Sequence, residues 1–131
     1  MSRSRKTAGE GTFHLIERKS NTVLIVDDDS DIRHALRLTF EWEQFEVVAE
    51  ACDGIEAVRL AAQLRPAFVI LDYYMPRMNG HKTSKLLREV APGTKIVAFS
   101  SVLEQKPRWA DAFLNKEGIS AAPVVLKELL V

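Results

Sequence analysis

The stretch AFVILDYYMP, residues 67–76, joins an unbroken apolar run to an acidic residue, Asp72, and then to a proline-containing loop. An apolar run of this length, bounded by turn residues, is typical of a parallel strand that is covered on both faces. The first apolar run of the chain, Val23 to Val26, also ends in acid, in three aspartates at 27–29. We therefore expect two buried strands that deliver carboxylates to one place.

Strand and helix patterns alternate from Thr22 onward. Further strands are predicted at residues 45–51, 95–99 and 112–114. Helical spacing of apolar residues predicts helices after a cap at Asp29 or Ser30, after Gly54, after Gly80 and after Pro123. Residues 102–108 contain a proline and have room for only a short helix. This alternation predicts an α/β fold, a doubly wound, five-stranded parallel sheet with helices on both faces.

Length and composition exclude several classes of protein. The 131 residues suit one domain, and 18 basic residues balance 18 acidic ones, so no net field attracts nucleic acid or an anionic membrane. The lone Cys52 cannot form an internal disulfide, and a buried or helix-edge thiol is expected. No apolar stretch approaches the roughly 18 residues of a membrane span. We expect a cytoplasmic protein without a membrane segment.

Residues 1–20 are expected to form a flexible N-terminal extension, because they mix basic residues and glycine with little apolar periodicity. Phe13, Leu15 and Ile16 are the apolar residues of this extension that could dock elsewhere. The predicted domain covers residues 21–131. Trp42 and Trp109 are expected to be packing residues within it.

The predicted fold gathers functional side chains at the carboxyl end of the sheet, where ligands bind in this architecture. Asp27, Asp28 and Asp72 each follow a strand, Ser100 follows the fourth strand, and Lys116 follows the fifth. Crowded carboxylates repel one another unless a cation intervenes, and oxygen ligands favour Mg²⁺, with Mn²⁺ as the alternative. A hydroxyl and an amine can bind phosphoryl oxygens. Together these groups predict phosphoryl transfer to a carboxylate, with Asp72 as the nucleophile.

Four short segments now carry a family resemblance: VDDD at 26–29, LDYYMPRMNG at 71–80, AFSS at 98–101 and FLNK at 113–116. In this order they resemble the receiver domain of two-component response regulators, from about Asn21 to the C-terminus. The resemblance implies a CheY-like, flavodoxin-like sheet with strand order 2-1-3-4-5. It also implies a phosphorylation switch.

The resemblance assigns a role to each site residue. Asp72 would accept a phosphoryl group from a sensor histidine kinase or a histidine phosphotransfer protein. Asp28, Asp72 and the backbone carbonyl of Tyr74 would ligate Mg²⁺, and Asp27 would act mainly through a metal-bound water. Phosphate-binding and switching roles fall on three further residues: Lys116 would bind the phosphate, Ser100 would swing toward it, and Phe113 would turn inward behind it.

The chain departs from the family pattern between Ser100 and Lys116, a segment that is shorter than usual by one or two helical turns. The fourth helix is therefore expected to be shortened or missing. In the family this region commonly serves dimerisation and output. Two possibilities therefore stay open: the protein forms a homodimer, or it signals to its partner through a different surface. The Lys116–Glu117 peptide bond is expected to be trans, because a cis bond before a non-proline residue costs roughly 2.5–4 kcal/mol.

Two surface features are expected to shape signalling. The edge that includes Ile32, Ala35 and Leu36 is expected to dock the kinase. Tyr74 is bulky, lies two positions beyond Asp72, and is expected to overhang the phosphoryl site and slow autodephosphorylation.

Three functions remain open at this point. The first is a stand-alone receiver that signals to an unknown downstream protein, since the chain ends directly after the last predicted helix and leaves no room for a DNA-binding domain. The alternative is a phosphorylation-independent, receiver-like protein-binding module. A small phosphatase would need a second carboxylate as general acid, which the sequence does not place. We therefore expect a switch and not an enzyme.

Overall fold

The computed structural model describes residues 19–131, so residues 1–18 of the expected extension lie outside the described residues. The elements follow in the order β1 (Thr22–Val26), α1 (Ser30–Trp42), β2 (Glu46–Ala51), α2 (Gly54–Leu64), β3 (Phe68–Asp72), α3 (Gly80–Val90), β4 (Lys95–Ser100), β5 (Ala112–Asn115), the 3₁₀ helix η1 (Lys116–Ala121) and α4 (Ala122–Leu129). Within these residues, no helix is both long enough and apolar enough to cross a membrane.

The five strands form one sheet in the order β2-β1-β3-β4-β5, as predicted. Each neighbouring pair is parallel, and β3 lies between β1 and β4. All residues of β1 and β3 are buried, because helices cover both faces of the sheet there. Parallel strands must all end at the same edge, so the acidic residues after β1 and at the end of β3 are carried to one place.

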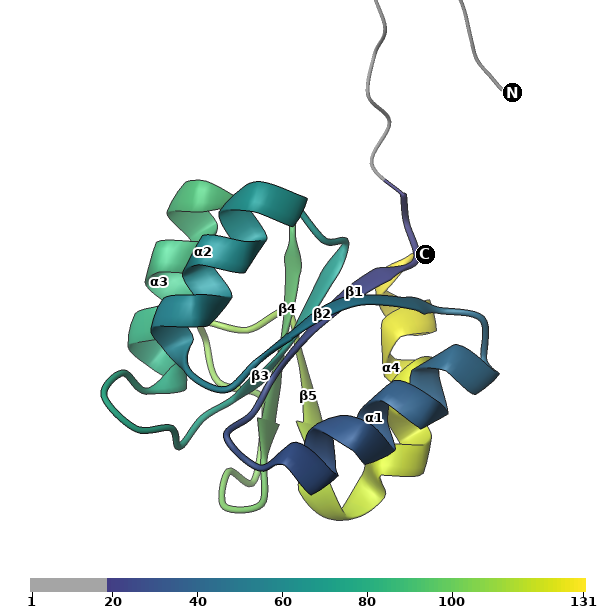
Figure 1. Cartoon of the computed structure of the whole chain (residues 1–131). Coiled ribbons are helices and arrows are strands. Elements are labelled where there is room, and N and C mark those ends of the chain that lie inside the picture. The colour runs from purple at the N-terminus through teal and green to yellow at the C-terminus, as the bar shows by residue number, and fades with distance from the viewer. Residues whose placement is uncertain (1–18) are drawn as a thin grey trace, which may run out of the picture.

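The helices divide evenly between the two faces of the sheet (Figure 1). Helices α1 and α4 bury Leu36, Phe40 and Leu126 against one face. Helices α2 and α3 pack on the other face, where Ala61 and Leu87 belong to a second apolar cluster. The strand side chains alternate between these two clusters, which explains the continuous apolar runs in the sequence.

Three helices begin at side chains that cap the first turn. The Asp29 carboxylate accepts hydrogen bonds from the backbone N–H groups of Asp31 and Ile32, as predicted. Asp53 and Asn79 cap α2 and α3 in the same manner. These caps satisfy donors that a helix N-terminus leaves free, so they fix where each helix leaves the carboxyl edge of the sheet.

The predicted loss of the fourth helix is observed, since residues 101–111, all of them described, contain no helix. An ion pair replaces part of its packing: the Arg88 guanidinium lies 3.1 Å from the Asp111 carboxylate. The same carboxylate accepts from the backbone N–H of Ile96, and Arg88 also donates to the carbonyl of Trp109. The loop from β4 to β5 is thereby tied to α3 and to β4.

Two expectations about α1 were wrong. Leu36 is fully buried in the core, so it cannot belong to a kinase-docking surface, whereas Ile32 and Ala35 are partly exposed. Trp42 is not a packing residue, because 85% of its surface is exposed. An amphipathic pattern identifies a helix but does not by itself determine which residues of its apolar face are fully covered. Trp109 does pack, against the cluster beneath α2 and α3.

Gly54 offers a test of the packing between α2 and α3. A Cβ atom at Gly54 would collide with the Thr83 hydroxyl and lie 2.9 Å from the Met78 methyl carbon. We predict that Gly54→Ala lowers the free energy of unfolding by about 1–3 kcal/mol, the usual cost of overpacking. Gly118→Ala is the matched control, because a Cβ there meets nothing within 4 Å. Urea denaturation measures both, and equal stability of the two variants would contradict the prediction.

Candidate functional site

Three aspartates meet at the carboxyl edge of the sheet. Asp27 and Asp28 follow β1, and Asp72 is the last residue of β3. One carboxylate oxygen from each lies within 4.8 Å of the other two. Asp27 and Asp72 are buried, whereas Asp28 is exposed and faces the solvent side of the cluster. The sequence predicted this meeting because strand ends coincide in a parallel sheet.

Backbone and side-chain hydrogen bonds hold Asp27 in place. Its Oδ1 accepts from the N–H of Asp29 at 2.9 Å, and its carbonyl accepts from Arg33 Nη1 at 2.7 Å. The other carboxylate oxygen, Oδ2, is fully buried and has no hydrogen bond of good geometry, although the Lys116 ammonium lies 2.8 Å away. An oxygen in this position is available to a cation or to a water bound to one.

Lys116 places its ammonium between the two buried carboxylates. Its Nζ lies 2.8 Å from Asp27 Oδ2 and 3.3 Å from Asp72 Oδ2, and only 22% of its side chain is exposed. Burial lowers the pKa of Lys116, but the two close carboxylates outweigh burial and hold the pKa above its usual value. The ammonium also sits 5.3 Å from the centre of the Phe99 ring. Lys116 is therefore a fixed positive charge.

Asp72 is the carboxyl group with the most altered acidity. Burial and, after it, the negative charge of Asp27 raise the pKa of Asp72 to about 6, although Lys116 and a hydrogen bond from the N–H of Tyr74 act to lower it. That N–H lies 3.2 Å from Asp72 Oδ1. At neutral pH the carboxylate is ionised but poorly solvated, which suits a nucleophile.

Ser100 ends β4 and is buried beside the cluster. Its Oγ accepts from the backbone N–H groups of Val102 and Leu103, at 3.0 and 3.2 Å. Phe113 lies on β5 opposite Ala98 and is partly buried. The hydroxyl thus holds the start of the loop that replaces the fourth helix.

The loop after β3 is closed by a backbone hydrogen bond from Gly80 to the carbonyl of Tyr73. The rings of Tyr73 and Trp109 stack with centroids 6.0 Å apart, and the His81 ring also stacks with Trp109, at 6.2 Å. Tyr74 is 64% exposed and contacts Tyr73 edge-on. Tyr73 thus packs toward the β4–β5 loop, and the Tyr74 ring is left exposed.

The residues fit a divalent cation of the Mg²⁺ type. The donor set consists of carboxylate oxygens without His or Cys, and the buried Asp27 oxygen lacks a well-oriented donor. Asp28 and Asp72 offer direct ligands, and Asp27 can accept from a metal-bound water. The fit depends on the oxygen ligands and on the closeness of all three aspartates, since exposed Asp28 alone would be an ordinary surface acid.

Comparison with known proteins agrees with this geometry. Residues 23–120 match the response regulator receiver domain family. The chain belongs to that family. Receiver domains bind Mg²⁺ at acidic residues and act as switches in two-component signalling. The family resemblance that the four sequence segments indicated is therefore confirmed.

The sequences of individual relatives differ considerably from this chain, although their folds are similar. A transcriptional regulatory protein of Bacillus subtilis, YdfI, is 43% identical over 70 residues, which are 53% of this chain and 33% of that protein. The response regulator domain of Thermotoga maritima CheB is 31% identical, with a TM-score of 0.70 over 86% of this receiver and 92% of that chain. The CheX-CheY-BeF3-Mg complex of Borrelia burgdorferi is 26% identical, with a TM-score of 0.78 over 84% and 89%. This receiver spans less than half the length of the curated relatives it matches.

Sequence reasoning missed three neighbours of the cluster. Arg33 supports the Asp27 carbonyl, Phe99 lies under the Lys116 ammonium, and Asn115 caps η1 by accepting from the N–H of Glu117. Only Asn115 had a signal, since asparagine before a helical turn is a common cap. The described residues contain no cis peptide bond, so the Lys116–Glu117 bond is trans, as predicted.

The acidity of Asp72 predicts a pH-dependent cost to folding in metal-free buffer. Its folded-state pKa of about 6 exceeds the ordinary value near 3.9, so ionisation destabilises the fold above pH 6 and has little effect below pH 4. We predict that Asp72→Asn raises the free energy of unfolding by about 1–3 kcal/mol at pH 7.5 and by less at pH 4.5. Urea denaturation with EDTA measures this difference. The exposed Glu104→Gln is the control, and a gain that is independent of pH would contradict the assignment.

Proposed function

We propose that this receiver is a Mg²⁺-dependent phosphorylation switch. Asp72 accepts a phosphoryl group from the phosphohistidine of a sensor histidine kinase or a histidine phosphotransfer protein, and the change is passed to a protein partner. The observation that carries the proposal is the position of Asp72, buried beside Asp27 and within 3.3 Å of the Lys116 ammonium. A carboxylate in that setting has a nucleophilic oxygen and a fixed cation for the incoming phosphate.

The transfer follows from this arrangement. A carboxylate oxygen of Asp72 forms a bond to phosphorus as the bond from phosphorus to the donor imidazole nitrogen breaks, and the electron pair returns to that nitrogen. The other ring nitrogen of the phosphohistidine carries a proton, so the products are an acyl phosphate on Asp72 and a neutral histidine on the donor. Lys116 stays charged throughout because its pKa is raised, so it can bind one phosphoryl oxygen while the charge on phosphorus spreads.

The metal ligands in this proposal are Asp28, Asp72 and the backbone carbonyl of Tyr74, with Asp27 holding a water on the ion. Mg²⁺, or Mn²⁺ in its place, supplies electrostatic stabilisation of the phosphoryl oxygens when bound. The Borrelia burgdorferi relative, a complex with BeF3 and Mg, supports this choice of ion. Asp29 is left out, since its carboxylate caps α1.

Switching is proposed to start at Ser100. If its hydroxyl turns to a phosphoryl oxygen on Asp72, the N–H groups of Val102 and Leu103 lose their acceptor. The β4–β5 loop would then shift, and Phe113, on the neighbouring strand, would move inward behind Ser100. The loop therefore takes the place of the missing helix as the element that reports phosphorylation.

The wider setting stays a prediction. We expect a stand-alone, cytoplasmic receiver with an unknown downstream protein, and a homodimer is compatible with it. Residues 19–131 contain no DNA-binding domain beside the receiver fold. We expect no enzymatic activity other than hydrolysis of its own phosphoryl group.

Phosphorylation is tested with a small-molecule donor. We predict that acetyl phosphate or phosphoramidate with Mg²⁺ adds one phosphoryl group per chain, and that Asp72→Asn abolishes the addition. Intact-mass spectrometry measures it. Asp29→Asn is the matched control, because asparagine also caps a helix and the nearby charge change leaves the acceptor intact.

The outcomes separate the three functions. Loss of the adduct in Asp72→Asn but not in Asp29→Asn supports the phosphorylation switch. Absence of any adduct at all Mg²⁺ concentrations indicates a phosphorylation-independent binding module. Rapid consumption of the donor without an accumulating adduct indicates a phosphatase.

Tyr74 is predicted to protect the phosphoryl group from water. Its exposed ring lies two residues beyond Asp72, so Tyr74→Ala should shorten the phosphoryl half-life by roughly 3- to 10-fold, or about 1 kcal/mol of barrier. Tyr74→Phe keeps the ring and should match the parent. Decay of the adduct after donor removal measures the half-life, and an equal or longer half-life in Tyr74→Ala would refute the shielding role.

A further inference from the structure

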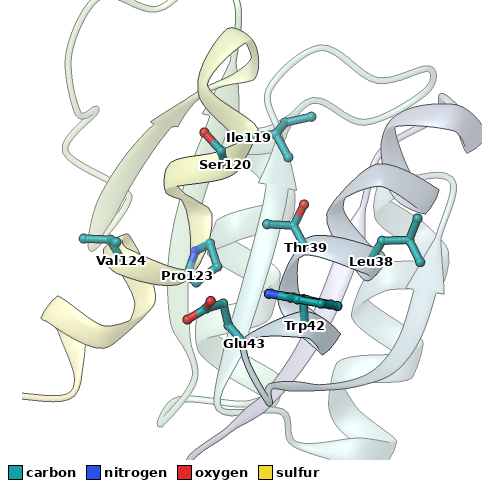
Figure 2. A pocket seen from close by; sticks show the side chains of 8 residues that line it. All are labelled: Leu38, Thr39, Trp42, Glu43, Ile119, Ser120, Pro123 and Val124. Atoms are coloured by element: carbon teal, nitrogen blue, oxygen red, sulfur yellow. The ribbon is translucent and has the colours of Figure 1, made fainter.

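A groove on the opposite side from α2 and α3 has no part in the proposed function. It runs between α1 on one side and η1 and α4 on the other, with a volume of about 680 Å³ (Figure 2). Leu38 and Trp42 line one wall, and Ile119, Pro123 and Val124 line the other. The lining is mostly apolar.

Three large apolar side chains are left exposed in this one groove. Trp42 is 85% exposed, and Leu38 and Val124 are each 55% exposed. Leu38 and Trp42 are four residues apart on α1 and therefore share a face. Scattered single apolar residues on a surface need no explanation, but a groove that combines a tryptophan with several aliphatic residues marks a contact site.

The N-terminal part of the chain enters the fold beside this groove. Asn21 donates to the carbonyl of Gln44 at 3.3 Å, and its own carbonyl accepts from the N–H of Glu46. The Lys19 ammonium lies 3.5 Å from the Glu46 carboxylate. These contacts hold residues 19–21 against the turn and strand start that follow α1, at Gln44 and Glu46, two and four residues beyond Trp42. Whatever precedes Lys19 therefore starts near the Trp42 end of the groove.

We propose that residues Phe13 to Ile16 occupy this groove in the same chain. Phe13, Leu15 and Ile16 are the only aromatic or branched aliphatic side chains among residues 1–18, and the groove offers matching apolar surface. Lys19 and Phe13 are six residues apart, which allows a reach of about 20 Å for an extended chain. The α1 wall from Leu38 to Glu43 is only about 8 Å long, at 1.5 Å per helical residue.

The short tether favours this segment over other occupants. A tethered segment competes at an effective concentration in the millimolar range, whereas a second copy or a separate protein competes at its own, lower concentration. The junction also has complementary charge, because the Lys19 ammonium lies beside Glu46 in the turn that follows the negative end of α1.

Trp42 provides the readout in the protein of residues 1–131. The test variant is Phe13→Ser/Leu15→Ser/Ile16→Ser, and the matched control is Arg3→Ser/Arg5→Ser/Lys6→Ser, which changes three residues of the same segment but no apolar one. Acrylamide quenching of tryptophan emission is measured at low micromolar protein. Trp42→Phe versions of each protein give the signal of Trp109 alone, which is subtracted. Circular dichroism and thermal melting check that each variant is folded.

We expect Trp42 in the parent and the control to be quenched about two-fold less than in the test variant, because covering half of an exposed indole halves its encounters with the quencher. The expected protection is the same when the protein is diluted ten-fold. Equal quenching of Trp42 in all three proteins would overturn the proposal. Protection that disappears on dilution would also overturn it, and would identify a second copy of the chain as the occupant.

Discussion

The structure depends on the burial of two like charges beside one ammonium. Asp27 and Asp72 leave the adjacent buried strands β1 and β3, and their repulsion is offset by Lys116, which follows β5, two strands from β3 and three from β1. Burying such charges without a partner costs several kcal/mol, so the sheet order, the length of β5 and the turn into η1 must all be correct together. The arrangement is held at a cost in folding free energy, as the raised pKa of Asp72 indicates. A site of this kind is expected where a fold serves chemistry and not stability alone.

Much of the fold followed from local patterns, and the remainder required knowledge of packing. Apolar runs and caps predicted every strand, and the parallel arrangement then placed Asp27, Asp28, Asp72, Ser100 and Lys116 at one edge. The short segment after Ser100 predicted the missing helix. The burial of Leu36 and the exposure of Trp42 were not predictable, because they depend on how far α1 rotates against α4. The supports from Arg33 and Phe99 join residues distant in sequence and have no local signal.

Loss of a helix between β4 and β5 changes what stabilises that edge of the sheet. A helix would satisfy its own backbone groups, but residues 101–111 rely on specific partners: the Ser100 hydroxyl at one end and the Arg88–Asp111 ion pair at the other. One of these anchors belongs to the proposed switch and the other to α3. In the proposed switch, the loop would therefore have one fixed end and one end whose hydrogen bonds would compete with a phosphoryl group. This differs from a helix that moves as a rigid body.

The stacked rings of Tyr73, Trp109 and His81 have a mechanical consequence. Their planes are within 14° of parallel across both contacts, so they form a column from the residue after Asp72 to the exposed first turn of α3. Tightly packed rings resist displacement, because tilting one ring would disrupt its contact with the next. The rings therefore link the backbone beside Asp72, at the buried end of β3, to the solvent-exposed imidazole of His81 at the start of α3.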